Sequence, residues 1–128
     1  MDKRNNNTIR YVIVKDGAVD VKYADDFISL MKDEYNYFFD SADCLFDRYL
    51  DIRVFVKEGS CFNEKPTMYY FDNNELMTSF NGTVFFAKLG KTKVMSLSNK
   101  EVNFLLNNIK RRDDGLFVVH NDINHHLY

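Results

Sequence analysis

The sequence predicts an α+β domain with a mostly antiparallel sheet and two or three helices packed on one face. Short runs of β-branched and aromatic residues recur between turn signals, which is typical of strands. Three other stretches have apolar residues spaced three and four apart, which is typical of amphipathic helices. The chain has 128 residues, 45% of them hydrophobic, which is the usual size and composition of one domain with one core.

The first expected element is a hairpin. Thr8–Val14 is rich in β-branched and aromatic residues, Asp16 and Gly17 form a turn signal, and Ala18–Tyr23 returns along the first strand. Before it, residues 1–7 are expected to form a flexible polar tail. We expect a single domain over residues 8–119 and a C-terminal tail over 120–128.

Two helices are expected to follow the hairpin. Asp25 and Asp26 stand at the start of the first, where free backbone N–H groups favour carboxylates. Ser41 begins the second. The apolar stripes are Phe27, Leu30, Met31, Tyr35 and Phe38 in the first, and Ala42, Leu45, Phe46 and Tyr49 in the second.

Four strands are expected in the middle of the chain. Ile52–Lys57 precedes a loop over Glu58–Lys65, and Thr67–Phe71 precedes a turn over Asp72–Asn74. Thr83–Leu89 is the third strand, and after Gly90 the segment Thr92–Met95 is expected to pair back on it.

The last helix has the clearest start signal in the chain. Ser98 and Glu101 form a capping box, in which each side chain accepts a hydrogen bond from the other residue's backbone N–H. Val102, Leu105, Leu106 and Ile109 then form an apolar stripe, and Lys110, Arg111 and Arg112 are expected to end the helix. Leu116–Val119 is expected to form a final short strand.

Charge is strongly segregated, although the formal net charge is only −2. Residues 16–51 contain ten carboxylates against three cations, whereas residues 85–112 contain seven cations against one carboxylate. An acidic surface on exposed helix faces could mimic phosphates and occupy the basic groove of a partner. The residues expected to bind a partner in this way are Asp25, Asp26, Asp33, Glu34, Asp40, Asp43 and Asp47.

The cationic stretch suggests an alternative, which is a binding site for a small anionic nucleotide. Its residues would be Lys88, Lys91, Lys93, Arg111, Arg112 and Tyr70. Interleaved aromatic residues could stack on bases, although rings in strands usually belong to a core (Tyr69, Tyr70, Phe80, Phe85 and Phe86). Direct nucleic-acid binding is disfavoured because the sequence pI of about 5.9 is not basic.

Cysteine and histidine give no catalytic or metal signature. Cys44 and Cys61 are expected to be buried, reduced thiols. The histidines His120, His125 and His126 lie in the last nine residues with no zinc-motif spacing. Phosphate-loop, dinucleotide-binding, zinc-protease and nucleophile-elbow motifs do not occur. We therefore expect no enzymatic activity, no catalytic or metal site and no cofactor, with an enzyme of unrecognised site as a further alternative.

Short motifs over residues 52–109 resemble small uncharacterised accessory proteins of phages and conjugative elements. The matching residues are Glu58-Gly59, Asn81-Gly82-Thr83-Val84 and Ser96-Leu97-Ser98, in under half of the chain. The resemblance implies an accessory protein of a mobile element, of a class that looks enriched in counter-defence proteins. It transfers no functional residue to this sequence.

The leading functional hypothesis is therefore a viral or mobile-element inhibitor that binds a host protein. The expected partner is a nuclease or another nucleic-acid-handling defence protein, met in the cytoplasm of the host cell. No apolar run approaches the roughly 20 residues needed to span a bilayer, so no membrane partner is expected. The oligomeric state is open, with a dimer as one alternative.

Overall fold

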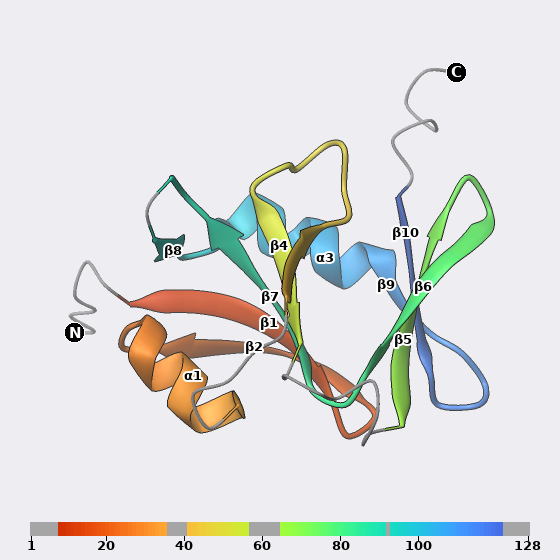
Figure 1. Ribbon diagram of the computed structural model, residues 1–128, viewed down its shortest axis with the longest axis horizontal. Coiled ribbons are helices and arrows are strands. Elements are labelled where there is room, and N and C mark those ends of the chain that lie inside the picture. The colour runs from red at the N-terminus through yellow and green to blue at the C-terminus, as the bar shows by residue number, and fades with distance from the viewer. Residues whose placement is uncertain (1–7, 36–40, 57–64, 92, 122–128) are drawn as a thin grey trace.

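The computed structural model describes residues 8–35, 41–56, 65–91 and 93–121, which form two helices and ten strands (Figure 1). No helix in these ranges is long and apolar enough to cross a membrane. The helices are α1 (Phe27–Tyr35) and α3 (Asn99–Asn108). The strands are β1 (Ile9–Lys15), β2 (Ala18–Ala24), β3 (Ser41–Cys44), β4 (Ile52–Val56), β5 (Pro66–Asp72), β6 (Glu75–Asn81), β7 (Val84–Leu89), β8 (Val94–Met95), β9 (Ile109–Arg111) and β10 (Phe117–Asn121).

The strands form two sheets. In the first, which we call sheet A, the strand order is β2-β1-β7-β4-β3, and β8 pairs with β7. In the second, sheet B, the order is β6-β5-β10-β9. All the pairs are antiparallel except β5 with β10. The expectation of a mostly antiparallel sheet with few helices is therefore confirmed.

Tight turns close two of the hairpins. Asp16 and Gly17 join β1 to β2 with φ values of 54° and 78°, and Asn73 and Asn74 join β5 to β6 with φ values of 53° and 65°. Two-residue hairpin loops with positive φ at both positions match the twist of the flanking strands, and Asn, Asp and Gly tolerate this conformation. The Asp-Gly hairpin expected at the N-terminus is confirmed.

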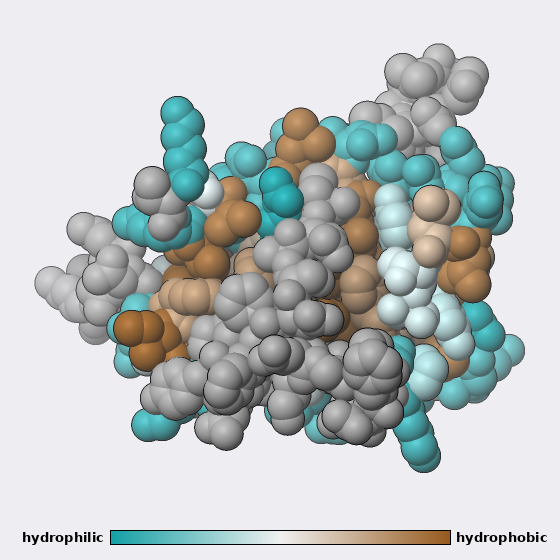
Figure 2. Space-filling model, viewed as in Figure 1, coloured by the Kyte–Doolittle hydropathy of each residue, from teal (hydrophilic) through white to brown (hydrophobic). Residues whose placement is uncertain are grey.

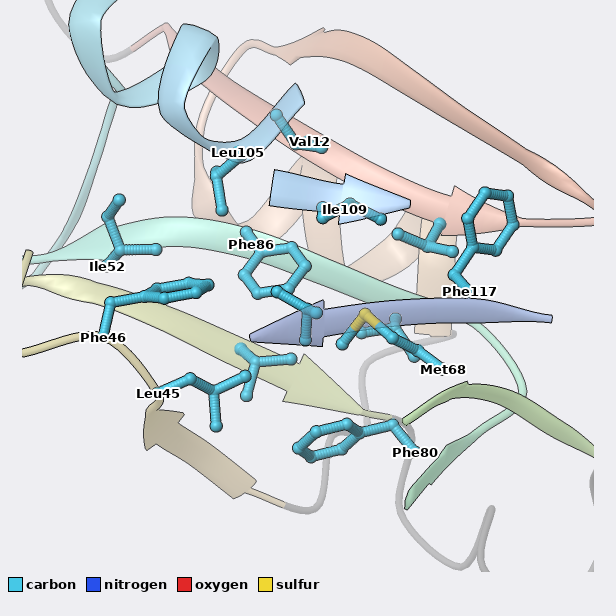
Figure 3. Close-up of a cluster of buried hydrophobic side chains, with 14 of the residues drawn as sticks. Val12, Leu45, Phe46, Ile52, Met68, Phe80, Phe86, Leu105, Ile109 and Phe117 are labelled. Atoms are coloured by element: carbon cyan, nitrogen blue, oxygen red, sulfur yellow. The ribbon is translucent and has the colours of Figure 1, made fainter. Parts of the chain in front are cut away.

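Sheet A is apolar on both faces, because consecutive residues of its central strands are apolar and their side chains alternate between the two faces. Val12 and Val14 point to one face, where they join an inner cluster, while Tyr11 and Ile13 point to the other and join an outer cluster. The inner cluster also takes in residues from β4, β7, the segment after β3, sheet B and α3 (Leu45, Phe46, Ile52, Val54, Met68, Phe80, Phe86, Val102, Leu105, Ile109, Phe117 and Val119; Figure 3). The outer cluster consists of Ile9, Tyr11, Ile13, Ala24, Leu30, Phe55, Phe85 and Ala87.

The two helices cover opposite faces of sheet A. Leu30 of α1 belongs to the outer cluster, whereas Val102 and Leu105 of α3 belong to the inner one. The expected packing of helices on one face is therefore not confirmed. The helices lie on opposite faces because β4 and β7 also carry apolar side chains on the face that α1 covers. There, Phe55 and Phe85 stack with their ring centroids 4.7 Å apart. A sheet that is apolar on both faces needs a cover on each.

The expected helix over residues 41–49 is wrong. Ser41–Cys44 is strand β3, which pairs antiparallel with β4. Leu45 and Phe46 are still buried in the inner cluster, and turn hydrogen bonds then connect Tyr49 to Phe46 and Ile52 to Tyr49. The apolar residues spaced three and four apart are buried by a strand followed by turns. The strand forms because this segment can pair with the edge of β4, which the local pattern does not reveal.

The end of the last helix also differs from the expectation. Lys110 and Arg111 do not end α3, but lie in strand β9, which pairs with β10. The helix stops at Asn108, and Ile109 has an extended backbone at φ −89° and ψ 110°. The start of α3 is confirmed, with both hydrogen bonds of the capping box present, and so is the pairing of β8 with β7.

Strand β6 was not expected, because five of its residues, Glu75–Ser79, are exposed and show no apolar alternation. The final strand extends to Asn121, two residues into the segment expected to be tail. Hydrophobic side chains are exposed on the β5–β6 hairpin (Figure 2), where Leu76 is 53% and Met77 54% exposed.

Candidate ligand-binding face

The acidic residues singled out in the sequence are not gathered in one place by the described structure. Asp25 and Asp26 are exposed at the start of α1, which packs on the outer-cluster face of sheet A. Asp47 is exposed on the opposite side, where its backbone and carboxylate are hydrogen-bonded to Asn121 of sheet B. Asp40 and the side chains of Asp33, Glu34 and Asp43 lie outside the described structure.

The proposed cationic site is divided between the two sheets. Lys88, Lys91 and Lys93 lie on or beside the β7–β8 hairpin, whereas Arg111 and Arg112 lie at the end of β9, at the other end of the molecule (Figure 1). Lys88 Nζ lies 3.6 Å from Glu101 Oε2, so it forms an ion pair with α3. These cations therefore do not converge on one ligand.

Tyr70 faces the protein interior. Its ring packs against the inner cluster, and its hydroxyl donates a 2.7 Å hydrogen bond to the backbone carbonyl of Leu45. The other interleaved rings Phe80, Phe85 and Phe86 are buried. Of the five aromatic residues listed from the sequence, Tyr69 is the one on the outside of its sheet, because its neighbours Met68 and Tyr70 both face the inner cluster.

The outer face of sheet B gathers rings on its two central strands. Tyr69 and Phe71 of β5 lie beside Val118 and His120 of β10, and none of these four side chains belongs to the inner or the outer cluster. Lys110 on β9 is the neighbour of Val118. We call this surface the ring face, and its members are Tyr69, Phe71, Leu76, Ser79, Lys110, Arg112, Val118 and His120.

Two ring contacts organise the ring face. Phe71 and His120 are stacked across the strand pair, with ring centroids 5.1 Å apart and planes at 24°. The guanidinium carbon of Arg112 lies 5.4 Å from the centroid of the Tyr69 ring, which is within the range of a cation–π interaction. Tyr69, Phe71 and His120 are all partly exposed, so part of their aromatic surface is accessible on this side of the sheet.

Positive charge lies on the β9 side of the ring face. Lys110 is exposed and forms no ion pair within the part of the chain that the structure describes. Arg112 Nη2 lies 2.8 Å from Asp114 Oδ2, and both side chains are nearly half exposed, so this pair is worth little and could be exchanged for another anion. On the β6 side, the described strand carries Glu75 as its one charged residue.

A separate hollow lies between the start of β1 and the start of α1. Its volume is about 330 Å³, and it is lined by Thr8, Ile9, Asp26, Phe27 and the segment 93–96. Asp26 caps α1: its carboxylate accepts a 2.8 Å hydrogen bond from the backbone N–H of Ser29. This hydrogen bond, together with a second one from the Ser29 side chain, lowers the pKa of Asp26 below its usual value of 3.8. The carboxylate therefore serves the helix rather than a ligand.

The described residues include no group of three or more histidine, cysteine or acidic side chains that could hold a metal ion. His120 lies in β10, while His125, His126 and Cys61 fall outside the described residues, as does the Cys44 side chain.

Asn121 Nδ2 lies between the carboxylates of Asp47 and Asp72, at 3.0 and 3.4 Å. This arrangement ties sheet B to the segment after β3.

Sequence reasoning missed Phe71 and His120. The outward orientation of both side chains follows from the alternation along β5 and β10. Met68, Phe117 and Val119 point inward, so residues an odd number of positions away point outward. The sequence pattern does not show this for His120, because it predicts a polar tail from residue 120 onward. Comparison with known proteins adds no further clue: no family model, curated protein or solved structure matches this chain.

Proposed function

We propose that this protein is a non-enzymatic binding protein that recognises a nucleotide-bearing anion on the ring face. The observation that carries the proposal is the row of partly exposed rings on the two central strands of sheet B, with Lys110 and Arg112 on one side. Exposed rings on a sheet can stack on bases, and neighbouring cations can neutralise phosphates.

Burial argues that these rings have a role other than stabilising the core. The inner cluster already fills the space between sheets A and B, and the ring face lies on the opposite side of sheet B. Tyr69, Phe71 and His120 remain partly exposed around the buried Val118, and a ligand that covers them would remove further apolar surface from water. Stacking on an aromatic ring is worth about 1–3 kcal/mol per base, which is enough to make Phe71 and His120 useful to a ligand.

The ring face takes the place of the nucleotide site expected from the sequence, which combined cations of residues 88–112 with Tyr70. Arg112 is retained, because it lies over Tyr69. Lys110 takes the place expected for Lys91 and Lys93, which lie at the opposite end of the molecule (Figure 1). The small net charge is compatible with the proposal, since what a phosphate senses is the local arrangement of cations rather than the overall pI.

Inhibition of a host nucleic-acid-handling protein in the host cytoplasm is a second, separate proposal, and phosphate mimicry by an acidic face is its mechanism. The described carboxylates give it no contiguous surface, since Asp25 and Asp26 are separated from Asp47 by sheet A. A binding protein on the ring face could counter the same host factors indirectly, by sequestering the ligand on which they act.

Thermal unfolding in the presence of defined ligands tests the binding proposal. We expect nucleoside monophosphates at millimolar concentration, or a 12-nucleotide oligonucleotide at micromolar concentration, to raise the melting temperature by mass action. The double variant Phe71→Leu, Lys110→Gln should lose this rise. The matched control is Tyr23→Leu, Lys91→Gln, which removes one partly exposed ring and one exposed cation elsewhere.

Two results would contradict the proposal. One is a panel in which neither mononucleotides nor oligonucleotides raise the melting temperature of the unmodified protein. The other is an equal loss of the ligand effect in both double variants. The single variant Lys110→Gln guards against misfolding, because its side chain is exposed and free of ion pairs in the described structure.

A further inference from the structure

We infer that the ligand of the ring face is a single-stranded nucleic acid of at least two nucleotides, laid with its backbone along β9 and its bases toward β5 and β6. This inference rests on the proposed function and names its ligand more closely. Three features of the surface carry it: the position of Phe71 and His120 outside both hollows described below, the spacing of the rings and the one-sided placement of the cations.

Two hollows of the described residues can be compared with the ring face, and one of them borders it at Arg112. The 330 Å³ hollow is lined by residues of sheet A and α1, and a second one, of about 430 Å³, is lined by Arg112, Asp113 and Asp114. Neither is lined by Phe71 or His120. Sites for small ligands are concave and cover most of the ligand's surface. Rings that lie outside such a hollow instead gain affinity by summing contacts along a polymer.

The rings stand at two levels along β5. Tyr69 with Arg112 forms one level, and Phe71 with His120 forms the next, two residues further along the strand. Two residues of a β-strand span roughly 6.6–6.8 Å, about twice the 3.4 Å per nucleotide along each strand of a duplex. Adjacent bases that occupy both levels must therefore be unstacked from each other, as in single strands bound to aromatic side chains.

Charge gives the bound strand a direction across the sheet. Lys110 and Arg112 lie on the β9 side, which suits phosphates. The β6 side offers Leu76 opposite Phe71 and Ser79 opposite Tyr69, and Glu75 is its one charged residue, which disfavours phosphates there. A nucleotide chain has this same asymmetry, because its charges lie on one side and its flat apolar bases on the other.

A length series of homopolymers tests the inference with defined probes. Binding of UMP, the dinucleotide, the tetranucleotide and the octanucleotide of uridine is measured by titration, alongside the matching deoxyuridine series. We expect the affinity to rise about tenfold or more from the monophosphate to the tetranucleotide, since one further stacked base is worth about 1–3 kcal/mol and 1.4 kcal/mol is a factor of ten. A duplex of equal length should bind more weakly than either single strand.

Salt dependence then locates the phosphates. The logarithm of the binding constant of a single strand should fall with the logarithm of salt concentration by about 0.7 per neutralised phosphate. Lys110→Gln should reduce this slope by about that amount, whereas Lys91→Gln should leave it unchanged. The series that binds with higher affinity shows whether the ligand is RNA or DNA, because the two series differ in the 2′-hydroxyl.

The outcomes separate the two proposals. If UMP binds as tightly as the octanucleotide, the inference is overturned while the proposed function stands. If the duplex binds as well as the single strand, or the salt slope is the same for Lys110→Gln and Lys91→Gln, the inference also fails. If no member of either series binds, the proposed function and the inference fall together.

Discussion

Asn121 and Asp47, 74 positions apart in the sequence, bind each other in both directions. The side-chain amide of Asn121 donates to Oδ2 of Asp47 at 3.0 Å, and the backbone N–H of Asp47 donates to Oδ1 of Asn121 at 3.3 Å. Asn121 is only 8% exposed and also lies 3.4 Å from a carboxylate oxygen of Asp72. This pair fastens the end of β10, next to the ring face, to the segment that follows β3.

We expect Asn121→Ala to lower the free energy of unfolding by about 1–3 kcal/mol, because it leaves a backbone N–H and two carboxylates without the buried amide. Chemical denaturation measures this change. Asn103→Ala is the control, since Asn103 is exposed on α3. An unfolding midpoint equal to that of the unmodified protein would show that the pair is not formed in solution.

Asn121→Asp should be sensitive to pH. It places a third carboxylate beside Asp47 and Asp72, which raises the pKa of the new group because like charges repel. The variant is then destabilised at neutral pH, where the group is ionised in the unfolded chain, and the penalty is relieved as the pH falls and the group becomes protonated. Melting temperatures at pH 7 and pH 4 should show a smaller deficit at pH 4, and an equal deficit at both would refute this explanation.

Adjacent leucines on α3 should respond oppositely to truncation. Leu105 is fully buried in the inner cluster, whereas Leu106 is 42% exposed. Leu105→Ala should cost about 2–5 kcal/mol through lost burial and the cavity left behind. Leu106→Ala should change stability by less than about 0.5 kcal/mol. Similar effects of the two substitutions in denaturant titrations would mean that α3 packs with a different face.

The capping box should contribute measurably to α3. The Ser98 hydroxyl accepts from the backbone N–H of Glu101 at 3.2 Å, and a Glu101 carboxylate oxygen accepts from the backbone N–H of Ser98 at 2.8 Å. Ser98→Ala should therefore lower the unfolding free energy by about 0.5–2 kcal/mol. Ser98→Thr keeps the hydroxyl and serves as the control. A denaturation midpoint unchanged by Ser98→Ala would count against the cap.

Asp26 should make α1 sensitive to acid. Its pKa is lowered by the hydrogen bond from the Ser29 backbone, so the ionised form is favoured in the folded state. The stabilisation is present above the unfolded-state pKa and is lost as the pH falls through the lower folded-state value, that is, below about pH 4. Asp26→Asn keeps the cap without a charge, so its melting temperature should fall less between pH 5 and pH 2.5 than that of the unmodified protein. An equal fall in both proteins would exclude this role.

The ring face shows why the site was harder to predict than the fold. Arg112 and Tyr69 were both noted in the sequence, yet they were grouped with Tyr70 and the lysines of the β7–β8 hairpin. Neighbours in a strand point to opposite faces, so Tyr69 and Tyr70 exchange roles if the register shifts by one residue. The pairing of β5 with β10, 49 positions apart at Tyr69 and Val118, decides which ring is outside.

The sequence by itself determined the elements whose signals are local. The turn at Asp16-Gly17 and the capping box at Ser98 depend on residues within three positions of one another, and the structure has both. Pairing decided that Ser41–Cys44 and Ile109–Arg111 are strands, because each hydrogen-bonds to the strand that follows it in the chain. Tertiary structure alone decided that the helices lie on opposite faces of sheet A and that rings and cations meet on sheet B, since burial and pairing are properties of the assembled sheets rather than of any one segment.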